Sequence, residues 1–374
     1  MIKLIDLNYY CHSEISEPAK ALELQKAATG YIAFARQQLK IELVKHINFE
    51  GVKYLYGVKC SFFRSRNKSW YVPFKTHRYI RKQQPDIVLI QGLIFPLQLI
   101  ALKIQLGWRV KIMVQHHGEH PAKGLKKWLQ KMADRYIQMY LFTSAENANE
   151  WIVAKIISDG EKCYEILEAS TWFQKMDKKY HLERLQLTGT PKFLWVGRLN
   201  ANKDPLTVIA AFERFVADQP GAKLYMIFQT EELLLEIKKK IASSPQLSET
   251  IILTGKVQHR ELKEWFNAAD FYISASHSEA SSYALIEAVA CGCVPIVTSI
   301  PPFRKITNEG KFGFLFEAGD PESLLHVLSK VKYINTEQLS ISIVEHFKKS
   351  LSFRSIADRL NSLSKLLISE KSHD

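Results

Sequence analysis

The 374-residue sequence lacks any apolar run as long as the roughly 18 residues that a membrane-spanning helix needs, so no membrane span is expected. Cysteine is scarce: the five residues are scattered and odd in number, which argues against a disulfide framework. The first residues lack the long apolar region and small-residue site of a cleavable signal peptide. A reducing cytoplasm is therefore the expected compartment.

Several ligand-binding motifs are also missing. No Asp-x-Asp occurs, so the carboxylate pair that commonly clamps a metal and a diphosphate has no candidate. No Walker loop and no G-x-G-x-x-G is present, which disfavours P-loop ATPases and dinucleotide dehydrogenases. Cys291 and Cys293 stand too close for a C-x-x-C site and have no second pair, so zinc is not expected. The sequence predicts an activity that needs neither a metal nor a cofactor.

The composition fits a soluble globular protein long enough for two domains, with 47% hydrophobic and 24% charged residues. Apolar β-rich runs alternate with helical patterns, which predicts parallel sheets covered by helices. We expect domains at residues 1–183 and 184–352, with a polar linker at 176–190 and an amphipathic helix at 353–369 within a C-terminal segment 353–374. The predicted strands are residues 2–7, 86–91, 111–115, 139–143, 164–167, 192–196, 223–228, 250–253, 271–276, 294–298 and 313–316.

Two carboxylates stand eight residues apart after the predicted strand at residues 271–276. Glu279 is expected on the loop at the carboxyl end of that strand, and Glu287 more than one turn into a helix that Ser281 or Ser282 can cap. In open α/β sheets that edge binds ligands, and a helix N-terminus favours an anion such as phosphate. The pair suits a nucleotide sugar, because carboxylates accept hydrogen bonds from sugar hydroxyls. An ordinary surface Glu followed by a helical Glu is the alternative.

Two cations follow the predicted strand at residues 192–196. Arg198 comes directly after Gly197, and Lys203 lies five residues further. A guanidinium fork and an ammonium group at one strand end can clamp a diphosphate. A solvated basic loop is the alternative interpretation.

These segments, with residues 291–298, resemble the retaining GT-B glycosyltransferases of the family 4 type (glycosyl transferases group 1). The similarity covers nearly the whole C-terminal half and is looser in the N-terminal half. It implies that Arg198 and Lys203 neutralise the donor diphosphate, that Glu287 binds the nucleotide ribose and that Glu279 lies against the donor sugar. Ala280 stands where relatives often have Gly, and residues 8–13 lack the glycines that many relatives carry in the first loop.

The resemblance also implies a fold of two doubly wound Rossmann-like domains facing across a cleft, with a C-terminal helix crossing back to the first. His117, or His116 by a slip of one residue, would face the donor sugar from the first domain. Backbone groups would complete the diphosphate site and flank the base. The diphosphate group comprises Ser281, Ser282, Tyr283 and Ala284, and the base-flanking group comprises Gly255, Lys256 and Val257.

Other interpretations of the histidine segment remain. The segment contains three histidines and a glutamate, His116, His117, His120 and Glu119, which are residue types that bind metals. Their spacing, however, is not that of the H-E-x-x-H motif. Consecutive residues after a strand also point to opposite sides. Capping of the helix that follows is another interpretation.

Positive charge is concentrated in the first half. Residues 1–190 carry 29 Lys and Arg against 17 Asp and Glu, an excess of 12 out of the total of +13. Residues 51–85 hold nine basic residues and no acidic one, interleaved with aromatics. Residues 123–136 predict a basic helix with one apolar face, formed by Leu125, Trp128, Leu129, Met132 and Tyr136. Docking of this helix on its own sheet is the favoured interpretation; adsorption to an anionic membrane is the alternative.

The sequence thus predicts a metal-independent, retaining glycosyltransferase of the hexosyltransferase type. Its donor is a nucleotide diphosphate sugar and its acceptor a saccharide or lipid-linked molecule of cell-surface polysaccharide or glycolipid synthesis. We expect it in the cytoplasm, or peripherally on the inner face of the membrane. A GT-B nucleotide-sugar epimerase is the alternative enzyme, although no distinct acid/base pair is visible. From another class, the net charge permits a basic nucleic-acid-binding protein, although no reading motif accompanies it.

Overall fold

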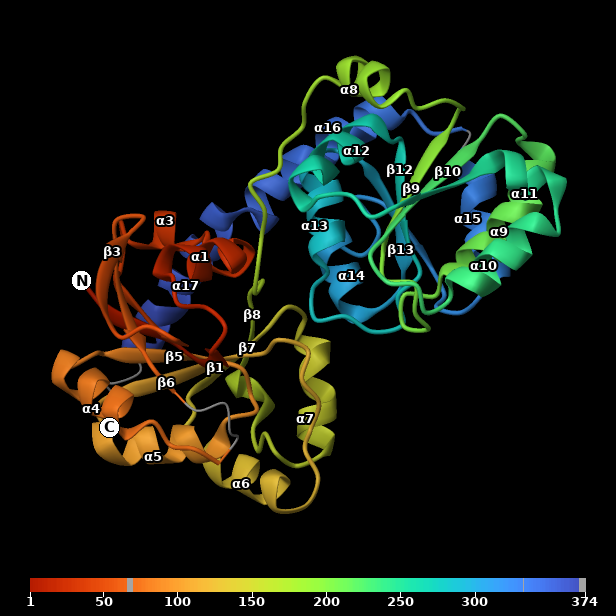
Figure 1. Ribbon diagram of the computed structural model, residues 1–374. Coiled ribbons are helices and arrows are strands. Elements are labelled where there is room, and N and C mark those ends of the chain that lie inside the picture. Colours follow the sequence, from red (N-terminus) through yellow and green to blue (C-terminus); the bar gives the residue numbers. More distant parts are fainter. Residues whose placement is uncertain (66–69, 332, 370–374) are drawn as a thin grey trace. The chain divides into compact units, whose positions relative to one another are not determined.

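A computed structural model describes residues 1–65, 70–331 and 333–369. Contacts divide the chain into two α/β units, drawn in Figure 1. Unit 1 comprises residues 1–170 together with the segment that begins at Phe353, and unit 2 comprises residues 171–352.

Unit 1 is built on an eight-stranded sheet with the order β3-β4-β2-β1-β5-β6-β7-β8. All neighbouring strands are parallel except β3 and β4, which form an antiparallel hairpin at one edge. The strands are β1 (Lys3–His12), β2 (Lys40–Ile47), β3 (Gly51–Leu55), β4 (Val58–Phe63), β5 (Ile87–Gln91), β6 (Lys111–Gln115), β7 (Met139–Phe142) and β8 (Cys163–Glu165).

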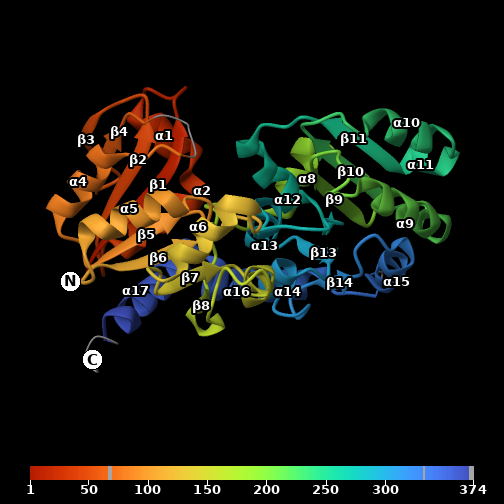
Figure 2. The same ribbon diagram turned by 90° about the horizontal axis from the view of Figure 1, so that it is seen from below.

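Helices cover both faces of this sheet. Figure 1 shows α4, α5 and α6 on one face and α1, α3 and α17 on the other, and Figure 2 views the molecule from the side of α4, α5 and α6. The helices of unit 1 are α1 (Pro18–Leu24), α2 (Lys26–Thr29), α3 (Ile32–Ala35), α4 (Phe74–Gln83), α5 (Pro96–Leu106), α6 (Gly124–Asp134), α7 (Asn149–Val153) and α17 (Phe353–Ser369), with the 3-10 turns η1 (Ala145–Ala148) and η2 (Gly160–Lys162).

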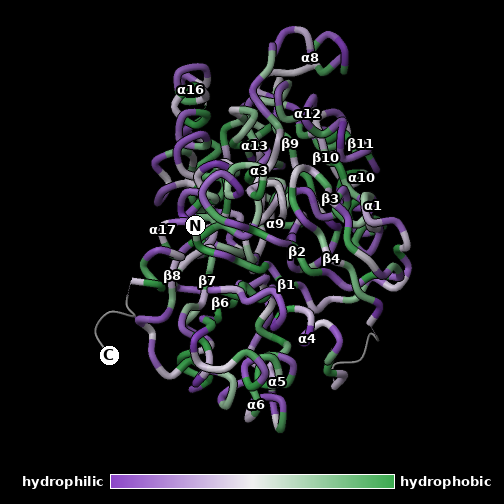
Figure 3. The backbone as a smooth tube through the Cα atoms, turned by 90° about the vertical axis from the view of Figure 1, so that its left-hand side faces the viewer, coloured by the Kyte–Doolittle hydropathy of each residue, from purple (hydrophilic) through white to green (hydrophobic). Residues whose placement is uncertain are grey.

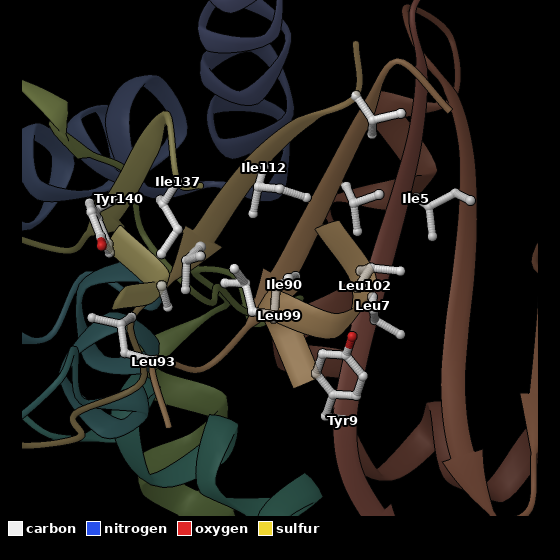
Figure 4. Packing of buried hydrophobic residues seen from close by; sticks show 14 of the residues in the cluster. Ile5, Leu7, Tyr9, Ile90, Leu93, Leu99, Leu102, Ile112, Ile137 and Tyr140 are labelled. Carbon is white, nitrogen blue, oxygen red and sulfur yellow. The ribbon is translucent and has the colours of Figure 1, made fainter. Parts of the chain in front are cut away.

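The core of unit 1 lies between the central strands and the helices that cover them. Alternate residues of a strand point to the same face, so Ile5 and Leu7 of β1 join a cluster with Ile112 of β6. Figure 4 shows these side chains with those of Leu99 and Leu102 from α5. Burial of aliphatic side chains of this size stabilises the unit by about 1.5–3 kcal/mol each.

Unit 2 has a six-stranded parallel sheet with the order β11-β10-β9-β12-β13-β14. Its strands are β9 (Lys192–Gly197), β10 (Lys223–Phe228), β11 (Ile251–Gly255), β12 (Phe271–Ser274), β13 (Val294–Thr298) and β14 (Phe314–Phe316). Its helices are α8 (Lys178–Leu185), α9 (Pro205–Asp218), α10 (Leu234–Ala242), α11 (Pro245–Thr250), α12 (Leu262–Ala268), α13 (Tyr283–Ala290), α14 (Pro301–Thr307), α15 (Pro321–Val331) and α16 (Thr336–His346), with the 3-10 turn η3 (His259–Glu261) and the π-helical turn η4 (Phe347–Leu351).

The C-terminal helix belongs to unit 1, as predicted. α17 packs against α3, and a Cβ atom on Gly30 would lie only 2.5 Å from the Phe353 ring. Glycine at position 30 therefore permits the close approach of this aromatic ring. Gln38 and Asp358 add a hydrogen bond of 2.7 Å between the first part of unit 1 and α17.

Three features of the fold differ from the sequence predictions. The strands β2, β3 and β4 were not predicted, and β1 continues through residues 8–12, which were expected to form a loop. The expected linker at 176–190 contains α8, whose N-terminus is capped by Asp177 and which packs on α12. The division by contacts therefore falls between Ser170 and Thr171 instead of 183 and 184. None of the helices that the structure describes has the length and apolar character needed to cross a membrane.

Candidate functional site

The candidate donor site lies where β9 and β12 end. These strands are parallel neighbours, so the loops that follow them meet at one edge of the sheet of unit 2. The Asn202 amide bridges the loops in both directions, donating to Ser278 O at 3.1 Å and accepting from Ser278 N at 3.1 Å. Asp204 adds a contact of 3.0 Å to His277. The two loops are thus fixed to each other by several hydrogen bonds.

These loops place the predicted cation and carboxylate together. Lys203 Nζ forms an ion pair with Glu279 Oε1, and the two side chains are 23% and 14% exposed. Arg198, in contrast, is exposed to solvent. The structure therefore brings Lys203 and Glu279 into one site, with Arg198 free to extend from the end of β9.

The start of α13 contributes the next part of the site. Tyr283 is the first residue of the helix and Ser282 its N-cap, close to the expected position. The hydroxyl of Ser282 forms no capping hydrogen bond, contrary to the prediction. Ser282 has φ 77°, a strained conformation for a residue with a side chain. The backbone N–H groups of Tyr283 and Ala284 lie at the N-terminus of α13, where the helix dipole favours an anion.

Glu287 lies one turn into α13 and is buried, with a side chain that is 6% exposed. Its Oε1 lies 2.6 Å from His259 Nε2. The His259 ring in turn stacks on Phe173, with a centroid separation of 5.3 Å. Sequence reasoning missed both His259 and Phe173, although His259 follows the predicted base-flanking residues by only two positions.

The base-flanking residues occupy the end of β11. Gly255 has φ 78°, in the left-handed region that favours glycine, and the space around its Cα is open. The neighbouring Thr254 hydroxyl is buried and has no hydrogen-bond partner among the described residues. Lys256 is exposed and Val257 half-buried. This loop has both space and an unused polar atom for a ligand.

In unit 1, the two neighbouring histidines have separate environments. His116 is buried, packs on Phe142 with a centroid separation of 4.9 Å, and lies 2.9 Å from Glu119 O through Nε2. His117 contacts Glu168 through Nδ1 and lies 2.7 Å from Gln91 Oε1 through Nε2. Both ring nitrogens of His117 are therefore engaged within unit 1, which does not support the expectation that this ring faces the donor sugar.

The basic stretch at residues 51–85 is spread over several elements. β3 and β4 pair as a hairpin with Tyr56 in its turn and Tyr54 nearby, while Trp70 and Phe74 follow the opposite end of β4. Arg66 and Lys68, part of this basic stretch, lie outside the described residues.

Helix α6 docks by an unexpected face. It buries Gln130, Ala133 and Asp134, whereas Leu125 and Trp128 are 63% and 55% exposed. This face docks because the buried Gln130 forms two hydrogen bonds there: it accepts one from Ala122 N and donates one to Leu93 O. The helix thus docks on its sheet, as expected, but Leu125 and Trp128 of the predicted apolar face lie outside, whereas Leu129, Met132 and Tyr136 are half-buried.

Metal binding has no geometric support. Within residues 1–65, 70–331 and 333–369, no group of three or more His, Cys, Asp or Glu side chains is placed to hold an ion. Metal independence of the activity stays a prediction.

Comparison with known proteins finds a family match in the same part of the chain. Residues 177–340, which include every donor-site residue except Phe173, match the family described as glycosyl transferases group 1. The match covers 164 of the 374 residues, and we refer to residues 177–340 below as the group 1 domain.

Two curated relatives illustrate the range of the similarity. The D-inositol 3-phosphate glycosyltransferase of Streptosporangium roseum is 26% identical over 170 residues, 42% of this chain and 38% of that protein. The GDP-mannose:cellobiosyl-diphosphopolyprenol alpha-mannosyltransferase of Xanthomonas oryzae pv. oryzae is 20% identical over 235 residues, 62% of this chain and 60% of that protein. The chain thus spans less than two thirds of the length of either relative.

The fold extends beyond the group 1 domain. A glycosyltransferase from Rickettsia africae, solved by crystallography, superposes with a TM-score of 0.71 at 14% identity, covering 98% of each chain. The fold of this chain is therefore that of the GT-B glycosyltransferases.

Proposed function

We propose that this chain transfers a sugar from a nucleoside diphosphate sugar to a saccharide or lipid-linked acceptor, with retention at the anomeric carbon. The observation that carries the proposal is the loop assembly of the group 1 domain, where Lys203, Glu279 and the start of α13 meet at the ligand-binding edge of the sheet. A cation, a carboxylate and a helix N-terminus suit a diphosphate joined to a sugar.

Each donor-site residue has a role in this proposal. Lys203 and Arg198 neutralise the diphosphate as it leaves, and the backbone N–H groups at the N-terminus of α13 assist them. Glu287 accepts hydrogen bonds from the ribose hydroxyls, and Glu279 lies against the donor sugar. No divalent metal is needed, because the cations and the helix dipole take over its charge.

The nucleotide is tested by melting the full chain against UDP, GDP, ADP and TDP, and then against the corresponding sugars, in the presence of EDTA. A ligand that binds only the folded chain raises the melting temperature. We expect one base to stabilise the protein more than the others. The absence of any stabilisation by all four would contradict the proposal.

We further propose that the acceptor is anionic or carried on an anionic membrane surface. Lys126, Lys127 and Lys131 flank the exposed Leu125 and Trp128 on α6, so a basic and apolar surface faces solvent. α5 packs beside α6 and adds the exposed Ile104, and Trp108 follows its end. Figure 3 shows both helices with hydrophobic and hydrophilic residues along the chain trace. Such a surface adsorbs to anionic lipid, each Lys near the surface contributing about 1 kcal/mol.

The names of the two relatives support this choice of acceptor. One acts on an inositol phosphate and the other on a diphosphopolyprenol, and both of these are anionic. A role in cell-surface polysaccharide or glycolipid synthesis, at the inner face of the membrane, follows from that chemistry.

Two other functions give different results in simple assays. A nucleotide-sugar epimerase would convert the donor without an acceptor and would keep the nucleotide attached to the sugar product. A nucleic-acid-binding protein would shift DNA or RNA in a gel, with an affinity that falls steeply as salt rises.

A further inference from the structure

The His117 ring is enclosed by hydrogen-bond partners of unit 1. Nδ1 contacts Glu168 Oε2, and Nε2 lies 2.7 Å from Gln91 Oε1. The backbone N–H of His117 donates to Glu119 Oε2 at 2.7 Å. The His117 side chain is 22% exposed and that of Glu168 only 6%. Ring and backbone are thus both fixed at the end of β6.

Asp6 decides the orientation of the Gln91 amide. Gln91 Nε2 lies 2.8 Å from Asp6 Oδ1. Because an ionised carboxylate only accepts hydrogen bonds, Gln91 must turn its NH₂ group toward Asp6. The second oxygen of Asp6 accepts from the Tyr31 hydroxyl at 2.7 Å, which keeps this carboxylate in place. Gln91 therefore presents its carbonyl oxygen to His117.

Both ring nitrogens of His117 then face acceptors. The carbonyl oxygen of Gln91 and the carboxylate of Glu168 can each only accept, whereas a neutral imidazole has a single N–H. Only the doubly protonated ring satisfies both contacts. Burial by itself lowers the pKa of His117, but the hydrogen bond and charge of Glu168, with the charges of Glu119 and Asp6, outweigh it and raise the pKa above its usual value.

The charges around the ring come from several elements. Glu168 follows β8, Glu119 lies in the same loop as His117, and Asp6 is on β1. Lys45 on β2 is the next cation, and it interacts electrostatically with Asp6. Three carboxylates therefore surround one imidazole and one ammonium, so loss of the imidazole proton would raise the excess negative charge in this buried site from one to two.

We propose that His117 is held as an imidazolium ion in the working protein, and that Asp6, acting through Gln91, is the positioning residue that keeps it charged. The inference rests on the function proposed above, because it concerns the loop that the resemblance to group 1 enzymes places near the donor. Both N–H bonds of the ring are used inside unit 1. The charged ring therefore fixes the loop and does not offer an N–H to a substrate.

The direct test is ¹⁵N NMR of the full chain labelled at histidine, with the His117 signals assigned by their loss in His117→Gln. We expect the His117 ring to lose its second proton at a higher pH than the exposed His326 does in the same titration, because its pKa is raised. A His117 ring that becomes neutral at the same pH as His326, or at a lower one, would overturn the proposal.

Variants test the chain of hydrogen bonds. Gln91→Met removes the acceptor of Nε2, and Asp6→Asn removes the charge that orients Gln91. Each should lower the pKa of His117 by about one unit or more. Tyr31→Phe is the matched control, because it removes the other hydrogen bond of Asp6 but keeps the carboxylate, and it should leave the pKa within a few tenths. Equal shifts in all three variants, or none in the first two, would contradict the role of Asp6.

Activity gives a readout that a purely structural role would not move. The alkaline limb of the pH–rate profile should shift to lower pH in Gln91→Met and Asp6→Asn, in step with the NMR titration. An unmoved limb would show that the charge of His117 has no part in turnover and would contradict the proposal. The NMR result does not depend on turnover, so a neutral His117 in an active transferase refutes only this inference, whereas failure to bind nucleotides refutes the proposed function alone.

Discussion

At the scale of single residues, Lys203 shows how the donor site is held before a ligand arrives. Its ammonium pairs with Glu279, and neither group is more than a quarter exposed. Because a diphosphate carries more charge than one carboxylate, it can compete for Lys203 and leave Glu279 to the sugar hydroxyls. In the proposed function, the ion pair keeps both groups in place for the donor.

Lys203→Ala should therefore weaken binding of the nucleoside diphosphate about 10- to 100-fold, since hydrogen bonds to charged groups contribute about 1.5–3 kcal/mol. Isothermal titration calorimetry measures this loss directly. Lys238→Ala on α10 is the matched control, because it removes an exposed lysine of the same unit. Equal affinities of Lys203→Ala and the wild type would remove Lys203 from the site.

Glu287 offers a second prediction. Glu287→Gln keeps the shape of the side chain but replaces a charged acceptor by a neutral amide, so the ribose bonds should weaken. We expect donor affinity to fall about tenfold while the melting temperature of the free protein changes little. The exposed Glu236→Gln on α10 controls for loss of one negative charge. A dissociation constant that does not change would refute the ribose assignment.

The sequence predicted these residues because each belongs to a motif of neighbouring positions. Lys203 and Glu279 follow strands that β-rich runs reveal, and Glu287 is fixed by its spacing from Glu279. Asp6 and Gln91 were missed because their contact joins residues 85 positions apart. Their only local signal is that each is a polar residue on an apolar strand.

Among the elements, α6 docks on unit 1 by one face and exposes another face to solvent. Gln130 fixes the helix through two backbone partners, which leaves Trp128 and the lysines outside. Replacing Lys126, Lys127 and Lys131 together by Ala should reduce binding to anionic vesicles several-fold, because electrostatic attraction acts within about 8 Å at physiological salt. Vesicle co-sedimentation at increasing salt measures the effect.

The matched control for α6 is the triple Ala variant of Lys238, Lys239 and Lys240 on α10, which removes the same charge from unit 2. It should bind vesicles like the wild type. If both triple variants lose binding equally, net charge is responsible and the α6 surface is not. If the wild type ignores anionic vesicles at low salt, the membrane proposal is wrong.

The contact of β1, β2 and α4 gives a prediction about pH. Burial lowers the pKa of His46 to about 4, and burial with the charge of His46 lowers the pKa of His77 to about 4. Tyr9 OH lies 2.9 Å from His77 Nε2. Because both folded-state values lie below the unfolded value of about 6.5, the unfolded chain binds more protons in between. Stability is therefore highest above about pH 6.5 and falls as the pH drops toward 4.

His77→Gln should remove about one of the protons that unit 1 takes up on unfolding. The free energy of unfolding should then fall less steeply with decreasing pH, by about 1.4 kcal/mol per pH unit. Urea unfolding at several pH values between about 7 and 4.5 measures the slope. The exposed His326→Gln of unit 2 is the control and should leave the slope unchanged. A slope for His77→Gln equal to that of the wild type would show that His77 is not the buried neutral group.

The strands of unit 2 were predicted closely, but β2, β3 and β4 were not. A continuous apolar run such as residues 223–228 predicts a parallel strand that is buried on both faces. β2 instead buries Glu42, Lys45 and His46, whose polarity hides the strand from pattern reading. Glu42 is satisfied by Tyr79 and Ser61, which come from α4 and β4. Partners so distant in sequence cannot be read from local composition.

At the scale of the whole molecule, the chain joins a charge-balanced unit to a basic one. Unit 1 holds 29 Lys and Arg against 18 Asp and Glu, an excess of 11 positive charges, and unit 2 holds 22 against 20, an excess of two. The group 1 match at residues 177–340 falls wholly within unit 2. The predicted boundary at 183/184 lies C-terminal to the observed one at 170/171, because α8 is as polar as a linker. The proposed function therefore gives recognition of the nucleotide to unit 2 and attraction of the acceptor to unit 1.

Metal-independent, retaining transfer from a nucleotide sugar is tested most directly by NMR of the reaction of the full chain with the nucleotide sugar that stabilises it best, in excess EDTA. We expect that nucleoside diphosphate is released in EDTA and that the sugar product keeps the anomeric configuration of the donor. Release that stops in EDTA and returns with Mg²⁺, or a product of inverted configuration, would contradict it.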